Sequence, residues 1–242
     1  MLRTLALALA LACAVTAAHA DEDAIRKAIA EMLGTEVKVE GVTKTDVLGL
    51  YEVRIVTEEG TRIVYTDEAA SYVFIGNIFD SKTQTDLTEA RMRKLNAIRF
   101  ADLPLAQAFK IVRGKGSRQL AYFTDPRCPY CKRLDQELAK VDDVTVHVFM
   151  IPIISPESPA ISKAVWCAPD RSKAWLDLML NSVSPPAAKA NCETPIEKNL
   201  GLSRKYKING TPTLVFADGQ RVSGVMSAAR LSKMLDEAAS RK

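Results

Sequence analysis

The chain has 242 residues and a formal net charge of +4, and 48% of its residues are apolar. Acidic and basic residues are interspersed and no basic tract stands out, so the charge pattern indicates no nucleic-acid partner. This length suits two unequal domains better than one small α/β domain.

Residues 1–20 have the layout of an export signal. Arg3 supplies a charged start, residues 5–12 alternate leucine with alanine, and Ala18-His19-Ala20 forms a small-x-small cleavage site. We therefore expect a signal peptide over residues 1–20 and a soluble, exported mature chain that begins at Asp21. A retained anchor helix is the alternative, but the apolar run is too short to span a bilayer, so no membrane insertion is expected.

Cleavage removes Cys13 and leaves four cysteines, which are Cys128, Cys131, Cys167 and Cys192. An even number in an oxidising compartment favours two pairs. Zinc is the alternative for a Cys-x-x-Cys motif. However, a four-cysteine zinc site needs two short-spaced pairs, and Cys167 and Cys192 lie far apart in the chain. We expect no metal and no other cofactor.

Residues 21–81 predict a small α+β domain. Apolar residues have helical spacing over residues 22–33, and β-branched segments separated by turn residues follow at 36–42, 50–57, 62–66 and 72–75. This pattern predicts one helix on an antiparallel sheet. So small a core is marginal alone and leaves a strand edge unpaired, so we expect this domain to dimerise with a second copy of the chain.

Residues 82–101 return to helical spacing. Apolar and long side chains follow one stripe, at Leu87, Arg91, Leu95 and Ile98. An ordinary surface helix and a rigid spacer helix between two domains both fit this pattern.

Residues 102–242 predict an α/β domain. The expected strands are 119–124, 144–153, 213–217 and 221–224, and the expected helices are 131–140, 160–167, 171–180, 194–207 and 228–239. A strand, a Cys-x-x-Cys helix, a second strand and a later hairpin form a thioredoxin-type arrangement. The helices between Pro152 and Pro195 are an insertion in it.

The motif Cys128-Pro129-Tyr130-Cys131 lies at the predicted junction of a strand and a helix. Backbone N–H groups and the dipole at a helix N-terminus stabilise a thiolate, so Cys128 is the predicted exposed attacking thiol. Cys131 lies inside the first turn and is the predicted buried resolving thiol. Pro129 fits the first helical position, where its missing N–H matters least. Tyr130 brings no positive charge near Cys128, so the Cys128 thiolate is expected to be less strongly stabilised than beside a charged histidine. The alternative is that Tyr130 is simply an aromatic residue on the rim of the site.

Thr211-Pro212 directly precedes a predicted strand. Only X–Pro bonds adopt the cis form at low cost, so this bond is a candidate cis peptide. A cis turn here would expose the backbone of Thr211 to an extended substrate segment.

Three motifs together resemble the periplasmic disulfide isomerases of the DsbC/DsbG family. They are Phe-Thr-Asp-x-x-Cys-Pro-Tyr-Cys, Val-Trp-Cys-Ala-x-Asp-x-x-Lys-Ala-Trp and Gly-Thr-Pro before a strand. The resemblance covers essentially the whole mature chain. The second cysteine pair, Cys167 and Cys192, is closer to the DsbC type, whereas Pro129-Tyr130 is closer to DsbG.

The resemblance implies a homodimer in the periplasm, with an N-terminal dimerisation domain over 21–81, a linker helix over 82–101 and a thioredoxin-like catalytic domain over 102–242. It implies a disulfide isomerase/reductase that rearranges wrong disulfides in misfolded or mis-oxidised exported proteins, with associated chaperone activity. A membrane thiol reductase of the DsbD type would keep the dithiol reduced. Cys167 and Cys192 would form a structural disulfide, with a second redox pair as the alternative.

Two other functions remain open. One is a dithiol oxidase or a DsbG-like sulfenic-acid reductase, and the other is a chaperone or holdase in which the thiols matter less. Proton transfer also lacks an assigned group. Thioredoxin has a buried acid six residues before its first cysteine, where this chain has Tyr122. Asp125 is interpreted as a turn or cap residue, so we expect water or backbone to serve Cys131.

Overall fold

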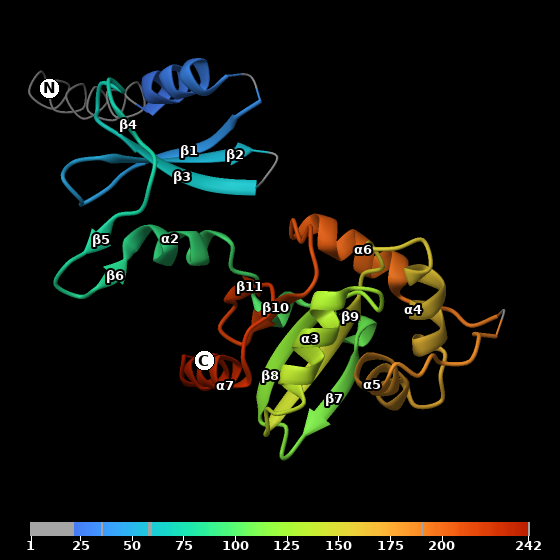
Figure 1. Cartoon of the computed structure of the whole chain (residues 1–242). Helices are drawn as coiled ribbons and strands as arrows, with labels where there is room; N and C mark the ends of the chain where they lie inside the picture. Colours follow the sequence, from blue (N-terminus) through green and yellow to red (C-terminus); the bar gives the residue numbers. More distant parts are fainter. Residues whose placement is uncertain (1–21, 35, 58–59, 190, 242) are drawn as a thin grey trace, which may run out of the picture. The chain divides into compact units, whose positions relative to one another are not determined.

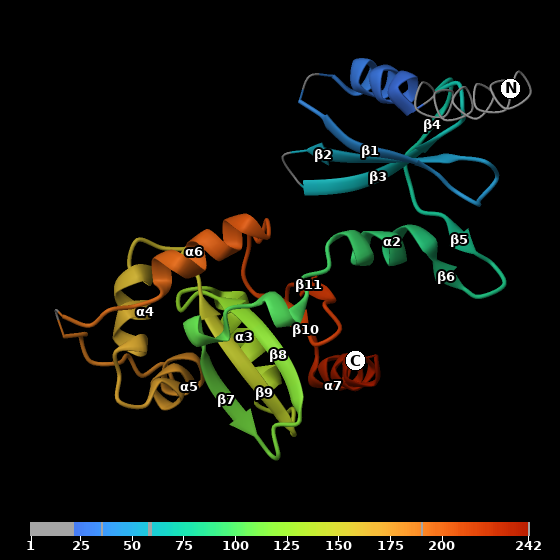
Figure 2. The same ribbon diagram turned by 180° about the vertical axis from the view of Figure 1, so that it is seen from behind.

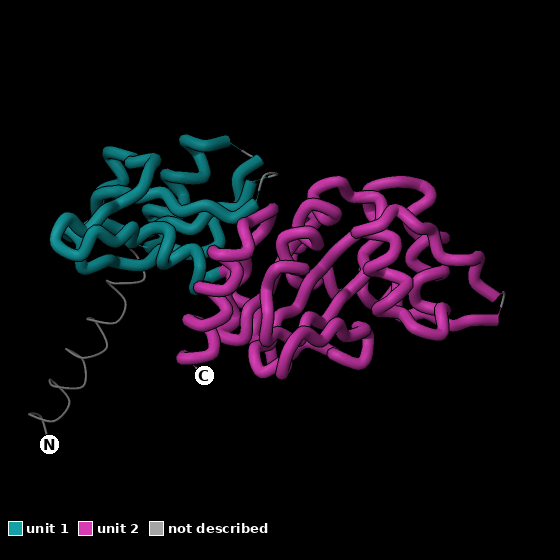
Figure 3. The backbone as a smooth tube through the Cα atoms, turned by 60° about the horizontal axis from the view of Figure 1, so that its bottom comes forward, with its two compact units in different colours: residues 1–95 teal, residues 96–242 magenta. Residues whose placement is uncertain are grey.

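The computed structural model describes residues 22–34, 36–57, 60–189 and 191–241. The predicted signal peptide, residues 1–20, lies outside the described residues. The chain divides into two compact units, Met1–Leu95 and Asn96–Lys242 (Figure 3). No helix in the described ranges is long and apolar enough to cross a membrane.

Unit 1 is built on a four-stranded antiparallel sheet. Its strands, in spatial order, are β1 (Lys38–Lys44), β2 (Tyr51–Thr57), β3 (Gly60–Thr66) and β4 (Val73–Phe74). Alternate residues of a strand face opposite sides of a sheet. Ile25 and Ile29, on the helix over residues 22–33, therefore pack against Val53 and its neighbours on one face only. The predicted helix and antiparallel sheet are confirmed.

Helix α2 (Leu87–Leu95) lies on the other side of this sheet and follows the short hairpin of β5 (Phe79–Asp80) and β6 (Thr85–Asp86) (Figures 1 and 2). The hydroxyl oxygens of Thr88 and Tyr65 are 2.7 Å apart. The Nε of Arg91 donates to both carboxylate oxygens of Glu52, each at 3.0 Å. These bonds hold α2 within unit 1, so the unit boundary after Leu95 divides the segment 82–101.

Unit 2 contains a five-stranded mixed sheet in the order β11-β10-β8-β9-β7. Its strands are β7 (Phe109–Arg113), β8 (Arg118–Thr124), β9 (Val144–Met150), β10 (Thr213–Phe216) and β11 (Arg221–Ser223). β8 and β9 are parallel, and every other pair is antiparallel. All seven residues of β9 are buried, as expected for an inner strand that is covered on both faces.

Helices cover both faces of this sheet. The helices of unit 2 are α3 (Pro129–Leu138), α4 (Ser158–Trp166), α5 (Arg171–Asn181), α6 (Ile196–Lys205) and α7 (Ala228–Ser240), with 3-10 turns η1 (Phe100–Asp102) and η2 (Leu105–Gln107). α3 packs with α5 and α7 on one face of the sheet (Figure 1). α6, η2 and the segment from Ile98 to Leu103 cover the other face (Figure 2). The thioredoxin-type arrangement is confirmed.

The sequence analysis missed β7. Phe109 and Ile111 are buried while Lys110 and Val112 are exposed, so the strand has the period of two that marks one buried face. β7 pairs antiparallel with β9 at the edge of the sheet. Two of its five residues are Lys110 and Arg113, and this polar content hid the alternation.

A disulfide joins Cys167, directly after α4, to Cys192, ahead of α6, with the two Cα atoms 6.1 Å apart. Both cysteines pack against the core that underlies α5. The disulfide therefore connects the end of α4 to the segment before α6 and closes the part of the insertion that contains α5.

We predict that the Cys167→Ser/Cys192→Ser variant loses about 3.5 kcal/mol of unfolding free energy, because the unfolded chain regains the entropy of the closed loop. Urea unfolding under non-reducing conditions measures this loss. The single variants should lose a similar amount, since each breaks the same bond. Equal stability of the double variant and the parent would contradict a structural role.

Candidate active site

Cys128 occupies the N-cap of α3 in an extended conformation, with φ −76° and ψ 117°. Its Sγ accepts a hydrogen bond from the backbone N–H of Cys131 at 3.3 Å, and Pro129 occupies the first turn as predicted. A sulfur in this position faces the positive end of the helix dipole. The helix start therefore directs the backbone N–H of Cys131 at the Cys128 sulfur.

The loop that contains Thr211 and Pro212 lies against Cys128. The Thr211–Pro212 peptide bond is cis, and the Cys128 thiol donates to the carbonyl oxygen of Thr211 at 3.4 Å. The carbonyl of Pro212 accepts from the N–H of Gly224, which ties the loop to the end of β11. The structure thus brings together the two segments that the sequence placed far apart.

Exposure differs from the prediction at one of the two thiols. Cys131 is fully buried, as expected, but Cys128 is only 2% exposed and not open to solvent. The Thr211 carbonyl lies against its sulfur, and the residue belongs to the apolar core of unit 2. Tyr130 is 57% exposed beside them, on the rim of the site.

Cys131 has surroundings that oppose its ionisation. Burial raises the pKa of Cys131 to about 12, even though the hydroxyls of Thr124 and Thr211 and the N–H of Asp125 favour its thiolate. The Cys131 thiol is therefore almost entirely protonated at neutral pH.

Asp125 does more than shape a turn. It is fully buried and accepts four hydrogen bonds: from the N–H of Arg127 (2.7 Å), Ile153 (2.7 Å) and Ile154 (2.9 Å), and from the hydroxyl of Ser158 (2.8 Å). Its own carbonyl accepts from the N–H of Cys128 at 3.1 Å. Asp125 thus joins the loop before α3 to the segment between β9 and α4.

The sequence analysis missed a buried acid beside the dithiol. The carboxylate of Asp135 accepts from the phenol of Tyr122 at 3.0 Å and from the indole N–H of Trp175 at 3.1 Å. The same phenol contacts the carbonyl oxygen of Cys131 at 3.3 Å. Burial raises the pKa of Asp135 to about 7, against the opposing effect of these two donors and of Arg113. Spacing could have revealed this residue, because Asp135 is four positions after Cys131 and so shares its face of the helix.

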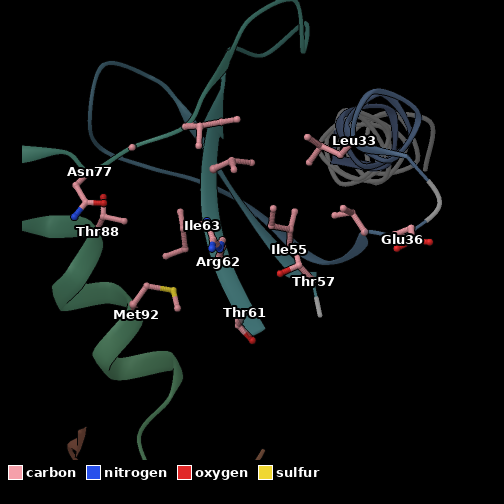
Figure 4. Close-up of a pocket in the computed structure, with 14 residues that line it drawn as sticks. Leu33, Glu36, Ile55, Thr57, Thr61, Arg62, Ile63, Asn77, Thr88 and Met92 are labelled. Atoms are coloured by element: carbon pink, nitrogen blue, oxygen red, sulfur yellow. The ribbon is translucent and has the colours of Figure 1, made fainter. Parts of the chain in front are cut away.

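Unit 1 contains a pocket of about 660 Å³ that the sequence did not indicate. Its lining includes Leu33, Ile55 on β2, Ile63 on β3 and Met92 on α2. Figure 4 shows Ile63 and Met92 lying toward one another. The lining is largely apolar, so this pocket suits an apolar side chain or segment.

Asp135 should make stability depend on pH. Its ordinary pKa of 3.8 becomes about 7 in the folded protein, so the folded state binds the additional proton. The stabilisation is fully present below pH 3.8 and is lost as the pH rises through about 7, a change of about 4 kcal/mol.

Asp135→Asn keeps an acceptor for Trp175 and removes the titration. We predict that the unfolding free energy of this variant rises relative to that of the parent by about 4 kcal/mol between pH 4 and pH 8. Urea titrations at each pH measure this difference. Asp177→Asn, a carboxyl on α5 that pairs with Lys173 at the surface, is the control and should show no such gain in this window. Parallel curves for the parent and Asp135→Asn would contradict the raised pKa.

Family models match both units. Residues 16–89 match the disulfide bond isomerase protein N-terminal domain, and residues 105–239 match a thioredoxin-like domain. A crystal structure of a disulfide interchange protein from Neisseria gonorrhoeae is 39% identical in sequence, with a TM-score of 0.54 over 57% of this chain and 99% of that chain.

Curated relatives agree with these matches. A probable thiol:disulfide interchange protein DsbC from Bordetella parapertussis is 42% identical over 77% of this chain and 65% of the relative. The alignment thus spans less than two thirds of that relative. The Bordetella avium protein with the same description is 39% identical over 88% of this chain and 74% of the relative. The thiol:disulfide interchange protein DsbC of Escherichia coli is 27% identical over 91% and 89%. With both units and most of the chain covered by such matches, the chain belongs to the DsbC family of thiol:disulfide interchange proteins.

Proposed function

We propose that this protein is a periplasmic thiol:disulfide isomerase in which Cys128 attacks and Cys131 resolves. The observation that carries the proposal is the environment of Cys128. Its sulfur caps α3, receives the Cys131 N–H and lies 3.4 Å from the carbonyl oxygen of Thr211 in the cis-proline loop. Relatives that are named as thiol:disulfide interchange proteins support this proposal.

The reaction begins at Cys128. Its thiolate attacks one sulfur of a wrong substrate disulfide, the substrate S–S bond breaks, and a mixed disulfide and a substrate thiolate result. A different substrate thiolate can then attack the mixed disulfide, which forms a new substrate disulfide and returns the Cys128 thiolate. This route rearranges disulfides without net oxidation or reduction.

Cys131 provides the second route. Its thiolate attacks Cys128, the Cys128–Cys131 disulfide forms, and the substrate leaves with both thiols reduced. A pKa of about 12 leaves about one Cys131 in 10⁵ ionised at pH 7. Slow release of this kind gives the substrate time to rearrange, so it favours isomerisation. Two electrons are then needed to restore the dithiol, and a membrane reductase of the DsbD type would supply them.

The loop of Thr211 would orient the substrate. Its carbonyl oxygen already accepts a bond from the Cys128 thiol, and ionisation of that thiol removes the donor. The Thr211 backbone is then available to pair with an extended substrate segment beside the attacking sulfur. The segments that Asp125 joins also carry the exposed side chains of Tyr130, Ile153 and Ile154, which would make apolar contacts with the substrate.

Unit 1 would supply dimerisation and chaperone binding. Strand β4 is short, lies at the edge of its sheet and carries exposed Phe74, with Tyr72 and Ile75 on either side. Such an edge favours pairing with a second copy of the chain. The largely apolar pocket beside Met92 favours binding of unfolded chains.

Cys128→Ser should abolish the refolding of scrambled ribonuclease, because the variant cannot form the mixed disulfide. Recovery of ribonuclease activity over time measures this effect. Cys131→Ser is the matched comparison: it should keep part of the isomerase activity and accumulate mixed disulfides that are visible on non-reducing gels. Isomerase activity in Cys128→Ser would refute the assignment of the attacking thiol.

Met92→Glu should weaken the suppression of aggregation of a reduced, unfolded substrate several-fold, because it places a charge in the unit 1 pocket. Light scattering measures this effect in a Cys128→Ala/Cys131→Ala background, which removes the thiol chemistry. Lys94→Glu, on the exposed side of the same helix, controls for the added negative charge. Equal suppression by both variants would place the chaperone surface elsewhere.

A further inference from the structure

Asp135 is a buried carboxyl that the thiol exchange described above does not use. It is 3% exposed and lies on α3 one helical turn beyond Cys131. Tyr122, at the centre of β8, connects the two residues, since its hydroxyl contacts both the Asp135 carboxylate and the Cys131 carbonyl. A buried acid one helical turn from a buried thiol needs a physical account, because burial of either charge is costly.

The hydrogen bonds around Tyr122 fit both protonation states of Asp135. A phenol has one hydrogen, so it donates to one of its two neighbours at a time. When Asp135 is ionised, Tyr122 donates to its Oδ2 at 3.0 Å. When Asp135 is protonated, the acid donates to the Tyr122 oxygen, and the phenol turns to the Cys131 carbonyl at 3.3 Å. Trp175 donates to Oδ1 in both states. The network therefore accepts a proton without leaving a polar group unpaired.

We propose that Asp135 takes up the proton that Cys131 releases when Cys131 resolves the mixed disulfide. The Tyr122 hydroxyl, which contacts both residues, changes its hydrogen-bond partner as Asp135 changes its protonation state. This inference rests on the proposed roles of Cys128 and Cys131. The Cys131 thiol loses its proton and Asp135 gains one. The Cys131 sulfur then bonds to Cys128, the bond from Cys128 to the substrate sulfur breaks, and the substrate leaves as a thiolate. Asp135 afterwards returns its proton to solvent.

Residues from β7, β8, α5 and α7 surround Asp135. Arg113 from β7 interacts with Asp135 electrostatically, and Tyr122 faces it from β8. α5 contributes the non-titrating Trp175, and α7 packs on β8 and α3 through the apolar Leu231 and Leu235. Burial, followed by the charges of Asp135 and Cys131, raises the pKa of the Tyr122 phenol well above its ordinary value, so Tyr122 stays protonated. Asp135, with a pKa of about 7, is therefore the group here that can take up a proton near neutral pH when Cys131 releases one.

A carboxylate that accepts the proton during the step gives a distinctive pH profile. Asp135 can accept a proton only while it is ionised, and its ionised fraction becomes constant above about pH 7. The rate of resolution should rise about tenfold per pH unit below pH 7 and level off above it. Without the acid, the rate should follow the ionisation of Cys131 alone and keep rising about tenfold per unit between pH 7 and 9.

The test is stopped-flow mixing of the reduced, full-length protein with one equivalent of dithiobis(nitrobenzoate) between pH 5 and 9. The first release of nitrothiobenzoate reports attack by Cys128, and the second reports resolution by Cys131. We expect the parent to show the break near pH 7 in the second phase and Asp135→Asn to lack it. Tyr122→Phe should keep the break but move it to higher pH, because the carboxylate loses a donor. Asp177→Asn is the control and should match the parent.

The two phases separate the hypotheses. Absence of the first phase in the parent would contradict the proposed role of Cys128. A first phase followed by a second phase that keeps its break in Asp135→Asn, or lacks one in the parent, would overturn the role of Asp135 alone. If Asp135→Asn does not fold, carbon NMR of the Asp135 carboxyl in the parent decides the question. Titration near pH 7 supports the inference, and titration below pH 5 with the surface carboxyls overturns it.

Discussion

The carboxylate of Asp125 is the constraint on which the reactive end of unit 2 depends. It follows β8 directly, and it accepts hydrogen bonds from four donors in two segments, one adjacent in sequence and one about thirty residues away. One of these segments leads into α3 and the other leads from β9 to α4. The start of α3, and with it the sulfur of Cys128, is therefore fixed relative to the central parallel strands. Because Asp125 is fully buried, loss of any of the four bonds would leave a desolvated carboxylate underpaired, which makes the arrangement cooperative.

The two thiols illustrate how a single helix turn creates opposite chemistry. Cys128 lies where the free N–H groups of α3 converge, whereas Cys131, three residues later, lies among apolar side chains such as Leu134 and Trp175. Both sulfurs are buried in the same core, but the first accepts a backbone N–H at the helix start, whereas burial raises the pKa of the second to about 12. In the proposed reaction, this difference in surroundings would place attack by Cys128 before resolution by Cys131, and the burial of Cys131 would lengthen the time between the two steps.

Much of this architecture could be predicted from local signals. The helix cap at Cys128, the proline at the first helical position and the proline before β10 each follow from backbone chemistry that is visible in a few consecutive residues. Apolar periodicity likewise identified the helix over residues 22–33 and the inner strand β9. The predictions were weaker where tertiary contacts decide. Asp135 looks like any polar residue of an amphipathic helix until Tyr122 and Trp175, from β8 and α5, enclose it. The cover over Cys128 comes from a loop more than eighty residues away in the chain, and short-range patterns carry no signal for such a contact.

The near-complete burial of Cys128 has a consequence for which proteins can be substrates. A disulfide on a rigid, folded surface cannot approach a sulfur that is 2% exposed and covered by the Thr211 loop. A disulfide on a locally unfolded strand would reach it more readily in the proposed function, because an extended chain can pair with the Thr211 backbone. In the proposed function, access to the sulfur would therefore favour wrong disulfides, whose surrounding chain is loose, over native disulfides that are held in folded surroundings.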